Sequence, residues 1–219
     1  MLLALAVPAL GASTAYAPHV DPADFVAGVD HPFLPLVPGT VFRFNETVGK
    51  HVREIVVTVT SDTKIVMGVK CVVVRDQEFE KGKLIEDTYD WYAQDKQGNV
   101  WYFGEDTKEM RNGKVDPEGS WEAGVRGAQP GLALPAQLAP GQPYRQEYLK
   151  GVAEDMAQIV AVADSVTVPF GALGGCVRVR EWSPLEHGSE MKWYAKGVGV
   201  VRSESTEHEI AELMSVTRP

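Results

Sequence analysis

Apolar and polar residues alternate along most of the chain beyond residue 30. Phe42 and Phe44, for example, are separated and followed by polar residues, which is the period of two that strands with one buried face show. A helical period is weak throughout, and only residues 21–26 and 206–214 have a pattern that would suit short helices. The pattern therefore predicts an all-β protein.

The chain also repeats itself in order. Residues 36–43 resemble 138–145, residues 57–62 resemble 159–164, and residues 91–93 resemble 193–195, each at an offset of 102. We interpret this as two copies of a roughly five-strand meander within one combined domain. The first copy spans 32–130 and carries a glycine-rich insertion from about 112, the second spans 131–219, and residues 18–31 form an N-terminal lead.

A single meander leaves one apolar face uncovered and two open edges. Two copies can bury the apolar faces and pair the open edges by closing on each other. We therefore expect an antiparallel barrel-like or half-barrel sheet. The sequence leaves both forms open.

The N-terminal segment has the features of a signal peptide. Residues 2–10 are almost wholly apolar, and Ala15-Tyr16-Ala17 matches an A-x-A cleavage site. We predict that residues 1–17 are removed, with a cut before Tyr16 as the alternative, and that the mature protein is soluble and secreted or periplasmic. No later run is long and apolar enough for a membrane span.

The net charge of the chain limits its partners. Its 30 Asp and Glu residues outnumber 21 Lys and Arg residues, which gives a formal charge of -9. Binding to nucleic acid or to an anionic membrane requires a basic surface, so we expect neither partner.

The two cysteines, Cys71 and Cys176, occupy equivalent places in the two copies. Two cysteines in an exported protein suggest one disulfide. Equivalent positions in a barrel lie on opposite walls, however, whereas a disulfide needs Cα atoms within about 7 Å. A Cys71–Cys176 disulfide and two buried free thiols remain equal alternatives.

Acidic residues gather around the turn at residues 95–99. If Ala93 pairs with Val100, Asp87 falls opposite Asp106, and facing like charges destabilise a sheet unless something compensates them. A bound Ca²⁺ could do so, although no cofactor is expected; salt bridges, for example with Lys108, or solvation are simpler. The candidate ligands of such a cation are Glu86, Asp87, Glu105 and Asp106.

Aromatic residues accompany these carboxylates. Trp91 and Trp193 recur in both copies and so belong to the shared core, whereas other aromatic residues are specific to one copy. An aromatic side chain beside carboxylates suits a sugar ring or another organic ligand in a barrel mouth, although it also suits an ordinary core. The candidate ligand-binding residues are Trp101, Tyr102, Trp121 and Trp182.

An arginine followed by an acidic residue occurs at equivalent places in the two copies, as Arg75-Asp76 and as Arg180-Glu181. These pairs could form symmetric polar sites inside a pocket. We favour cross-strand ion pairs on the outer surface, which contribute little to stability.

Familiar catalytic signatures are missing. The chain has no G-x-S-x-G elbow, phosphate-binding loop or dinucleotide fingerprint, and residues 208–212 lack the second histidine of a zinc-protease motif. Asp90 and Glu105 are the candidates for general acid–base catalysis if the protein is an enzyme, which we do not favour.

Two stretches resemble known proteins. Residues 33–40, FLPLVPGT, and residues 87–109, DTYDWYAQDKQGNVWYFGEDTKE, are similar to a group of uncharacterised exported bacterial proteins. This resemblance implies export but no activity. The duplicated meander alone is more loosely similar to periplasmic open-barrel proteins that carry lipid or apolar ligands.

These observations favour an exported, soluble, barrel-like protein that binds a small ligand, whether apolar, sugar-like or assisted by a cation. The first alternative is a secreted hydrolase or lyase that uses paired carboxylates. The second is a structural or assembly protein that pairs with another chain through an open sheet edge.

Overall fold

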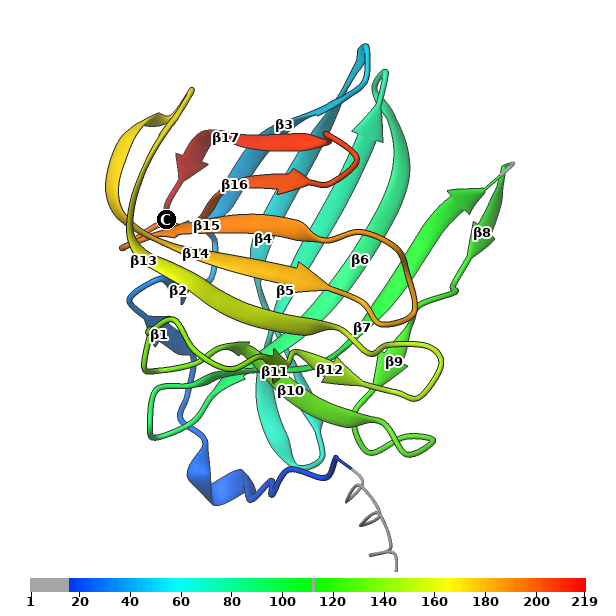
Figure 1. Ribbon diagram of the computed structural model, residues 1–219. Helices are drawn as coiled ribbons and strands as arrows, with labels where there is room; N and C mark the ends of the chain where they lie inside the picture. Colours follow the sequence, from blue (N-terminus) through cyan, green and yellow to red (C-terminus); the bar gives the residue numbers. More distant parts are fainter. Residues whose placement is uncertain (1–15, 112) are drawn as a thin grey trace, which may run out of the picture.

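The computed structural model describes residues 16–111 and 113–219. Most of the predicted signal peptide, residues 1–15, and Asn112 of the insertion lie outside the described residues. Regular structure is almost entirely β (Figure 1). The elements are the 3₁₀ helix Pro22–Asp24 and the strands β1 Val29–His31, β2 Leu34–Leu36, β3 Val41–Val48, β4 His51–Val66, β5 Val69–Glu80, β6 Lys83–Gln94, β7 Val100–Arg111, β8 Lys114–Asp116, β9 Trp121–Glu122, β10 Gln129–Leu134, β11 Tyr144–Arg145, β12 Glu147–Tyr148, β13 Met156–Val168, β14 Gly171–Trp182, β15 Glu190–Ala195, β16 Gly199–Ser205 and β17 Ile210–Thr217.

All strands except β1 and β2 belong to one antiparallel sheet that curls into a nearly closed barrel (Figure 1). Its order is β11-β13-β14-β15-β16-β17-β3-β4-β5-β6-β7-β10-β12, with β8 and β9 also paired to β7. The sheet thus contains two meanders in chain order, β3–β7 and β13–β17, which join where β17 pairs with β3. The predicted all-β, barrel-like class is confirmed, while the assignment of the meanders to two copies of one unit stays a prediction.

A short segment closes the barrel. The strands β11 and β12 stand at opposite ends of the sheet order, yet only Gln146 separates them in the chain. Tyr144 and Arg145 pair with β13, and the next strand pairs with β10. One chain segment, residues 144–148, therefore connects both edges. Because β11 pairs only with Met156 and Ala157, residues 158–168 of β13 have no strand partner on this side among the described residues, and the barrel is only nearly closed.

Gly131 on β10 makes this closure possible. A Cβ atom at this position would overlap the backbone of Arg145 and Gln146. The absence of a side chain therefore lets the closing segment pack directly on β10.

The sheet buries apolar residues on both faces. The inner core includes Phe42, Phe44 and Leu213, whereas a second cluster on the outer face of β5–β7 includes Val73 and Phe103. Ala123 and Ala128 of the glycine-rich insertion belong to this second cluster. The insertion therefore covers an outer face of the sheet.

One of the two predicted helices is wrong. Residues 21–26 contain the 3₁₀ helix, but the predicted helix at 206–214 is instead a turn followed by β17. The strand forms because β3 offers it a complete partner along the junction of the two meanders, so pairing outweighs the local helical preference.

The structure contains free thiols and no Cys71–Cys176 disulfide. Cys71 belongs to the outer cluster and Cys176 to the inner core, and both are fully buried. The disulfide alternative is therefore wrong in this structure, because the two side chains lie in different cores.

We predict that both thiols resist modification in the native protein and react after unfolding without any reductant. Burial raises the pKa of the Cys71 thiol to about 12, so the reactive thiolate is scarce as well as inaccessible. Labelling with a maleimide, followed by mass measurement, tests this. Two unreactive cysteines in unreduced, unfolded protein would contradict it.

We also predict that Gly131→Ala lowers the free energy of unfolding by about 1–3 kcal/mol, because the added methyl group must displace the closing segment. Urea unfolding measures the change. Gly174→Ala is the matched control, since the nearest atom to its added Cβ is a Ser165 hydroxyl oxygen at 3.8 Å. Equal effects of the two substitutions would contradict the role of Gly131.

Candidate functional site

A cavity of 520 Å³ lies inside the barrel. Its apolar lining comes from Leu34, Leu36, Phe42, Phe44, Ile55, Val57, Val74, Ala133, Val198, Val200 and Ala211. Its acidic lining comes from Glu46, Asp76, Glu78, Glu86, Asp90, Glu105, Glu147, Asp155, Glu181 and Glu190. The cavity is thus both apolar and strongly acidic.

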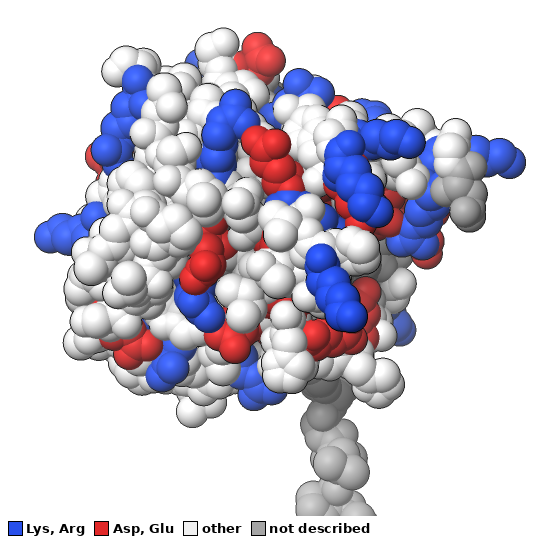
Figure 2. Space-filling view, turned by 90° about the horizontal axis from the view of Figure 1, so that it is seen from above, with Lys and Arg blue, Asp and Glu red and all other residues white. Residues whose placement is uncertain are grey.

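The two kinds of lining follow one another along the strands. Inward positions of β3 change from Phe42 and Phe44 to Glu46, and those of β5 change from Val74 to Asp76. The acidic positions lie toward the β3–β4 and β5–β6 turns, at the top of the barrel in Figure 1. Viewed from above, acidic side chains are visible on this face among outward-projecting Lys and Arg side chains (Figure 2). The cavity therefore has an apolar end and an acidic end.

Burial within the barrel strongly disfavours ionisation of these acids. Burial, together with the charge of neighbouring carboxylates, raises the pKa of Asp76, Glu78 and Asp90 to about 7. The same causes raise the pKa of Glu105 to about 7 and that of Glu147 to about 8. Near neutral pH these groups are therefore only partly ionised.

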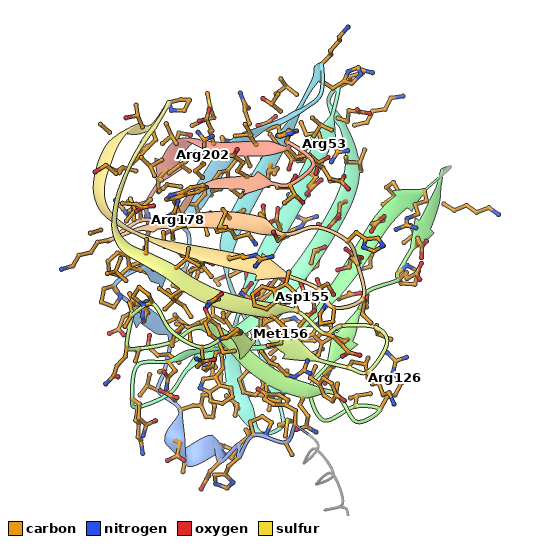
Figure 3. All side chains as sticks on the ribbon, viewed as in Figure 1. Arg53, Arg126, Asp155, Met156, Arg178 and Arg202 are labelled. Carbon is orange, nitrogen blue, oxygen red and sulfur yellow. The ribbon has the colours of Figure 1, made fainter. Side chains whose placement is uncertain are left out.

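Few cations balance the acidic lining. Lys192 Nζ lies 2.7 Å from Glu181 Oε2 and 3.3 Å from Glu190 Oε2. Although burial disfavours its ammonium, these carboxylates raise the pKa of Lys192 well above its ordinary value. Arg53, near the upper end of the barrel in Figure 3, contacts Glu46 at 3.4 Å. Both cations are thus already engaged.

Asp90, Tyr102 and Glu105, three predicted site residues, meet in the cavity wall. Asp90 and Glu105 are directly opposite each other in the β6–β7 ladder. The Tyr102 hydroxyl donates a hydrogen bond of 2.6 Å to Asp90 Oδ1, and the Thr107 hydroxyl donates one of 2.9 Å to Glu105 Oε2. These three predicted residues therefore form part of the acidic wall of the cavity.

The predicted register around these acids is wrong. Ala93 pairs with Trp101, and Asp87 lies opposite Lys108 instead of Asp106. The pairing next to the turn already differs from the prediction by one residue, and a bulge between Asp90 and Tyr92 adds a second residue of shift by Asp87.

The predicted cation site is split between the two faces of the sheet, because each of its two pairs consists of neighbouring residues on one strand. Glu86 and Glu105 line the cavity. Asp87 on the outer face accepts two hydrogen bonds from Arg75, of 2.7 and 2.9 Å. Asp106 contacts Lys108 at 2.8 Å. The four residues therefore do not converge on one ion, and salt bridges compensate the outer pair.

Among the predicted aromatic residues, Tyr102 lines the cavity and the three tryptophans do not. Trp101 Nε1 donates to Asp95 Oδ2 at 2.8 Å, which stabilises the turn. Trp121 is 2% exposed and packs edge-on against Tyr102, with centroids 5.4 Å apart. Trp182 lies under the Arg180 guanidinium at 5.2 Å. Trp121 thus supports the wall from behind.

Sequence reasoning missed Tyr92 and Tyr194, which also line the cavity. The Tyr92 ring stacks on Tyr102 with centroids 4.9 Å apart. Their signal was present: Tyr92 is two positions from Asp90 and so shares its face of β6.

The preferred interpretation of the recurring Arg-acid pairs is correct for Arg75, which forms a cross-strand ion pair on the outer surface, and wrong for the acids. Asp76 and Glu181 line the cavity, whereas Arg75 binds Asp87 on the outside. Neighbouring residues of a strand point to opposite faces, so an outward arginine requires an inward acid. The pocket alternative is correct for both acids.

One set of three possible metal ligands comes together among the described residues. Atoms of His19, Asp21 and Asp24 lie within 4.8 Å of one another, but all three residues are exposed. They belong to the N-terminal lead and not to the cavity. The carboxyl groups of the cavity are spread over its wall.

Comparison with known proteins identifies no family. No family model matches the chain, and no curated protein is significantly similar to it. Two crystal structures are similar in outline. One is of a proposed exported protein with a YmcC-like fold from Bacteroides fragilis, with 18% identity and a TM-score of 0.49, covering 85% of this chain and 99% of its own. The other is of a proposed lipoprotein from Parabacteroides distasonis, with 14% identity and a TM-score of 0.40, covering 84% of this chain and 98% of its own.

In the described part of the chain, no helix has the length and apolar character needed to span a membrane.

We predict that the free energy of unfolding falls as pH rises from about 4 to about 8. The raised pKa values mean that Asp76, Asp90 and their neighbours bind more protons in the native state than in the unfolded state over this range. The stability that these groups contribute is therefore fully present below their pKa in the unfolded state. It is lost as the pH rises through their pKa in the native state.

Urea unfolding at several pH values tests this dependence. Asp76→Asn should reduce the slope, because it removes one of the titrating groups. Asp106→Asn on the outer face should leave the slope unchanged. Stability that rises with pH over this range would contradict the assignment.

Proposed function

We propose that the protein is an exported binding protein that holds a small organic ligand inside its barrel. The observation that carries this proposal is the 520 Å³ cavity, which is continuous from an apolar end to an acidic end. Binding sites for small molecules are usually concave and combine an apolar lining with a few placed polar groups, with volumes of roughly 300–1,000 Å³. Export is supported by the predicted signal peptide.

The enzyme alternative has one supporting observation, the facing pair Asp90 and Glu105. General acid–base catalysis needs two carboxyl groups whose environments give them different pKa values. Burial raises the pKa of both groups to about 7. This pair is a single observation, whereas the apolar and acidic lining of the whole cavity supports binding.

The assembly alternative also has one supporting observation, the free edge of β13 at residues 158–168, beyond its two pairs with β11. The cavity is the stronger observation, because it offers a ligand a large concave surface with both apolar and acidic lining.

We predict that primary alkanols from 1-hexanol to 1-nonanol bind with an affinity that increases along the series. Each additional methylene buried at the apolar end should contribute about 0.8 kcal/mol, which is roughly a fourfold decrease in Kd. Isothermal titration calorimetry measures this trend. An affinity that does not change with chain length would contradict an apolar binding end.

A matched pair of variants on β4 locates the binding site. Ile55 lines the cavity, while Ile65 on the same strand is 61% exposed. Ile55→Ala should weaken alkanol binding several-fold, and Ile65→Ala should not change it. Equal effects would place the binding site elsewhere.

A further inference from the structure

We propose that the ligand is an organic cation with an apolar tail, such as an alkylammonium. Its positive group lies among Asp76, Asp90 and Glu105, and its tail extends toward Phe42 and Leu36. This inference rests on the proposed function and specifies the chemistry of the ligand.

The charge of the lining is the first argument. Ten carboxyl groups line the cavity, and Lys192 is the one basic residue of its described lining. Lys192 is bound by Glu181 and Glu190, and Arg53 by Glu46. Among the described residues, seven lining carboxyl groups therefore have no salt-bridge partner: Asp76, Glu78, Glu86, Asp90, Glu105, Glu147 and Asp155.

The second argument is an orphaned acceptor. Asp76 Oδ1 is completely buried and has no hydrogen-bond partner, although its residue lines the cavity. A buried acceptor without a partner costs free energy, and such atoms are rare in folded proteins. Oδ1 is not itself exposed to the cavity, so a ligand beside this carboxyl group would compensate for the missing partner through its charge. Since the nearby groups on β5 and β6 are mostly acids, that charge should be positive.

The distribution of the acids favours an organic cation over a metal ion. A hard metal ion such as Ca²⁺ draws six to eight oxygen atoms to about 2.3–2.6 Å from one point. Within the described residues, no three cavity carboxyl groups converge within 4.8 Å. An ammonium group instead donates several hydrogen bonds in different directions, and it can contact acids on neighbouring strands.

The opposite end of the cavity indicates the tail. Phe42, Phe44 and Val57 face inward below the acidic positions, and Leu36 adds to this end from the β1–β2 hairpin. These side chains provide no polar group for a second charge. A ligand that is charged at one end and apolar at the other would therefore match both ends, whereas a fatty acid would place its carboxylate among like charges.

Three probes with the same tail and different head groups test the inference. Octylammonium, 1-octanol and octanoate should be titrated into the full mature protein at one pH near 7.5. A charge-assisted hydrogen bond gives an expected preference of about 10- to 100-fold for octylammonium over 1-octanol, and octanoate should bind most weakly.

Paired variants distinguish the cavity from the outer surface. Asp76→Asn and Asp90→Asn should reduce the affinity for octylammonium about tenfold or more and leave that for 1-octanol nearly unchanged. Asp87→Asn and Asp106→Asn remove the same charge from the outer face and should change neither affinity. A thermal melt of each variant verifies that it is folded.

The outcomes separate the two proposals. Equal binding of the three probes, or a preference for octanoate, would overturn the cationic ligand and leave the binding cavity in place. An equal loss for all probes in Asp76→Asn would likewise overturn it, because the residue would then act only on the shape of the cavity. Failure of every probe to bind would overturn the proposed function and the inference together.

Discussion

Closure of the barrel by residues 144–148 is the constraint on which the rest of the structure depends. Two strands that follow each other in the chain pair with opposite edges of the sheet, so one short segment turns an open sheet into a nearly closed barrel. The packing of this segment requires a bare backbone at Gly131. Because the sheet is nearly closed, its inner face is shielded from much of the bulk water, and several carboxyl groups on that face are buried.

Burial in turn determines the chemistry of the interior. Asp76, Asp90 and Glu105 would be ordinary ionised groups on an open sheet, and inside the barrel their pKa values are raised to about 7. Concentrating so many acids around one cavity opposes folding, since each acid must be protonated or buried as a charge. A sequence that keeps this arrangement sacrifices stability at the site, which is typical of functional sites.

Part of the wall was accessible from the sequence. Asp90, Tyr102 and Glu105 were identified because acidic and aromatic residues cluster on two adjacent strands, and all three line the cavity. The predicted cation ligands failed because Glu86 and Asp87 are adjacent on β6, and Glu105 and Asp106 are adjacent on β7, so each pair is divided between the two faces in any register. The predicted register was wrong as well, and no local pattern marked the bulge between Asp90 and Tyr92.

The tryptophans also show that the sequence does not determine which face of a strand a side chain occupies. Trp101 and Trp121 were distinguished by being specific to one copy, but the structure uses one to stabilise a turn and the other to support Tyr102 from behind. A residue that occurs in only one copy is not required by the shared scaffold. Its absence from the other copy does not indicate the face of the strand on which it lies.

By itself, the sequence determined the all-β class, the strands of the first meander and the concentration of acids near its middle. These features follow from a period of two and from composition, both of which are local. Only the tertiary structure decided which face of each strand became the interior, that Asp76 and Glu181 point inward, and that the cysteines lie in separate cores. Alternation divides a strand into two faces without naming the inner one, because that choice is made by pairing and closure between residues far apart in the chain.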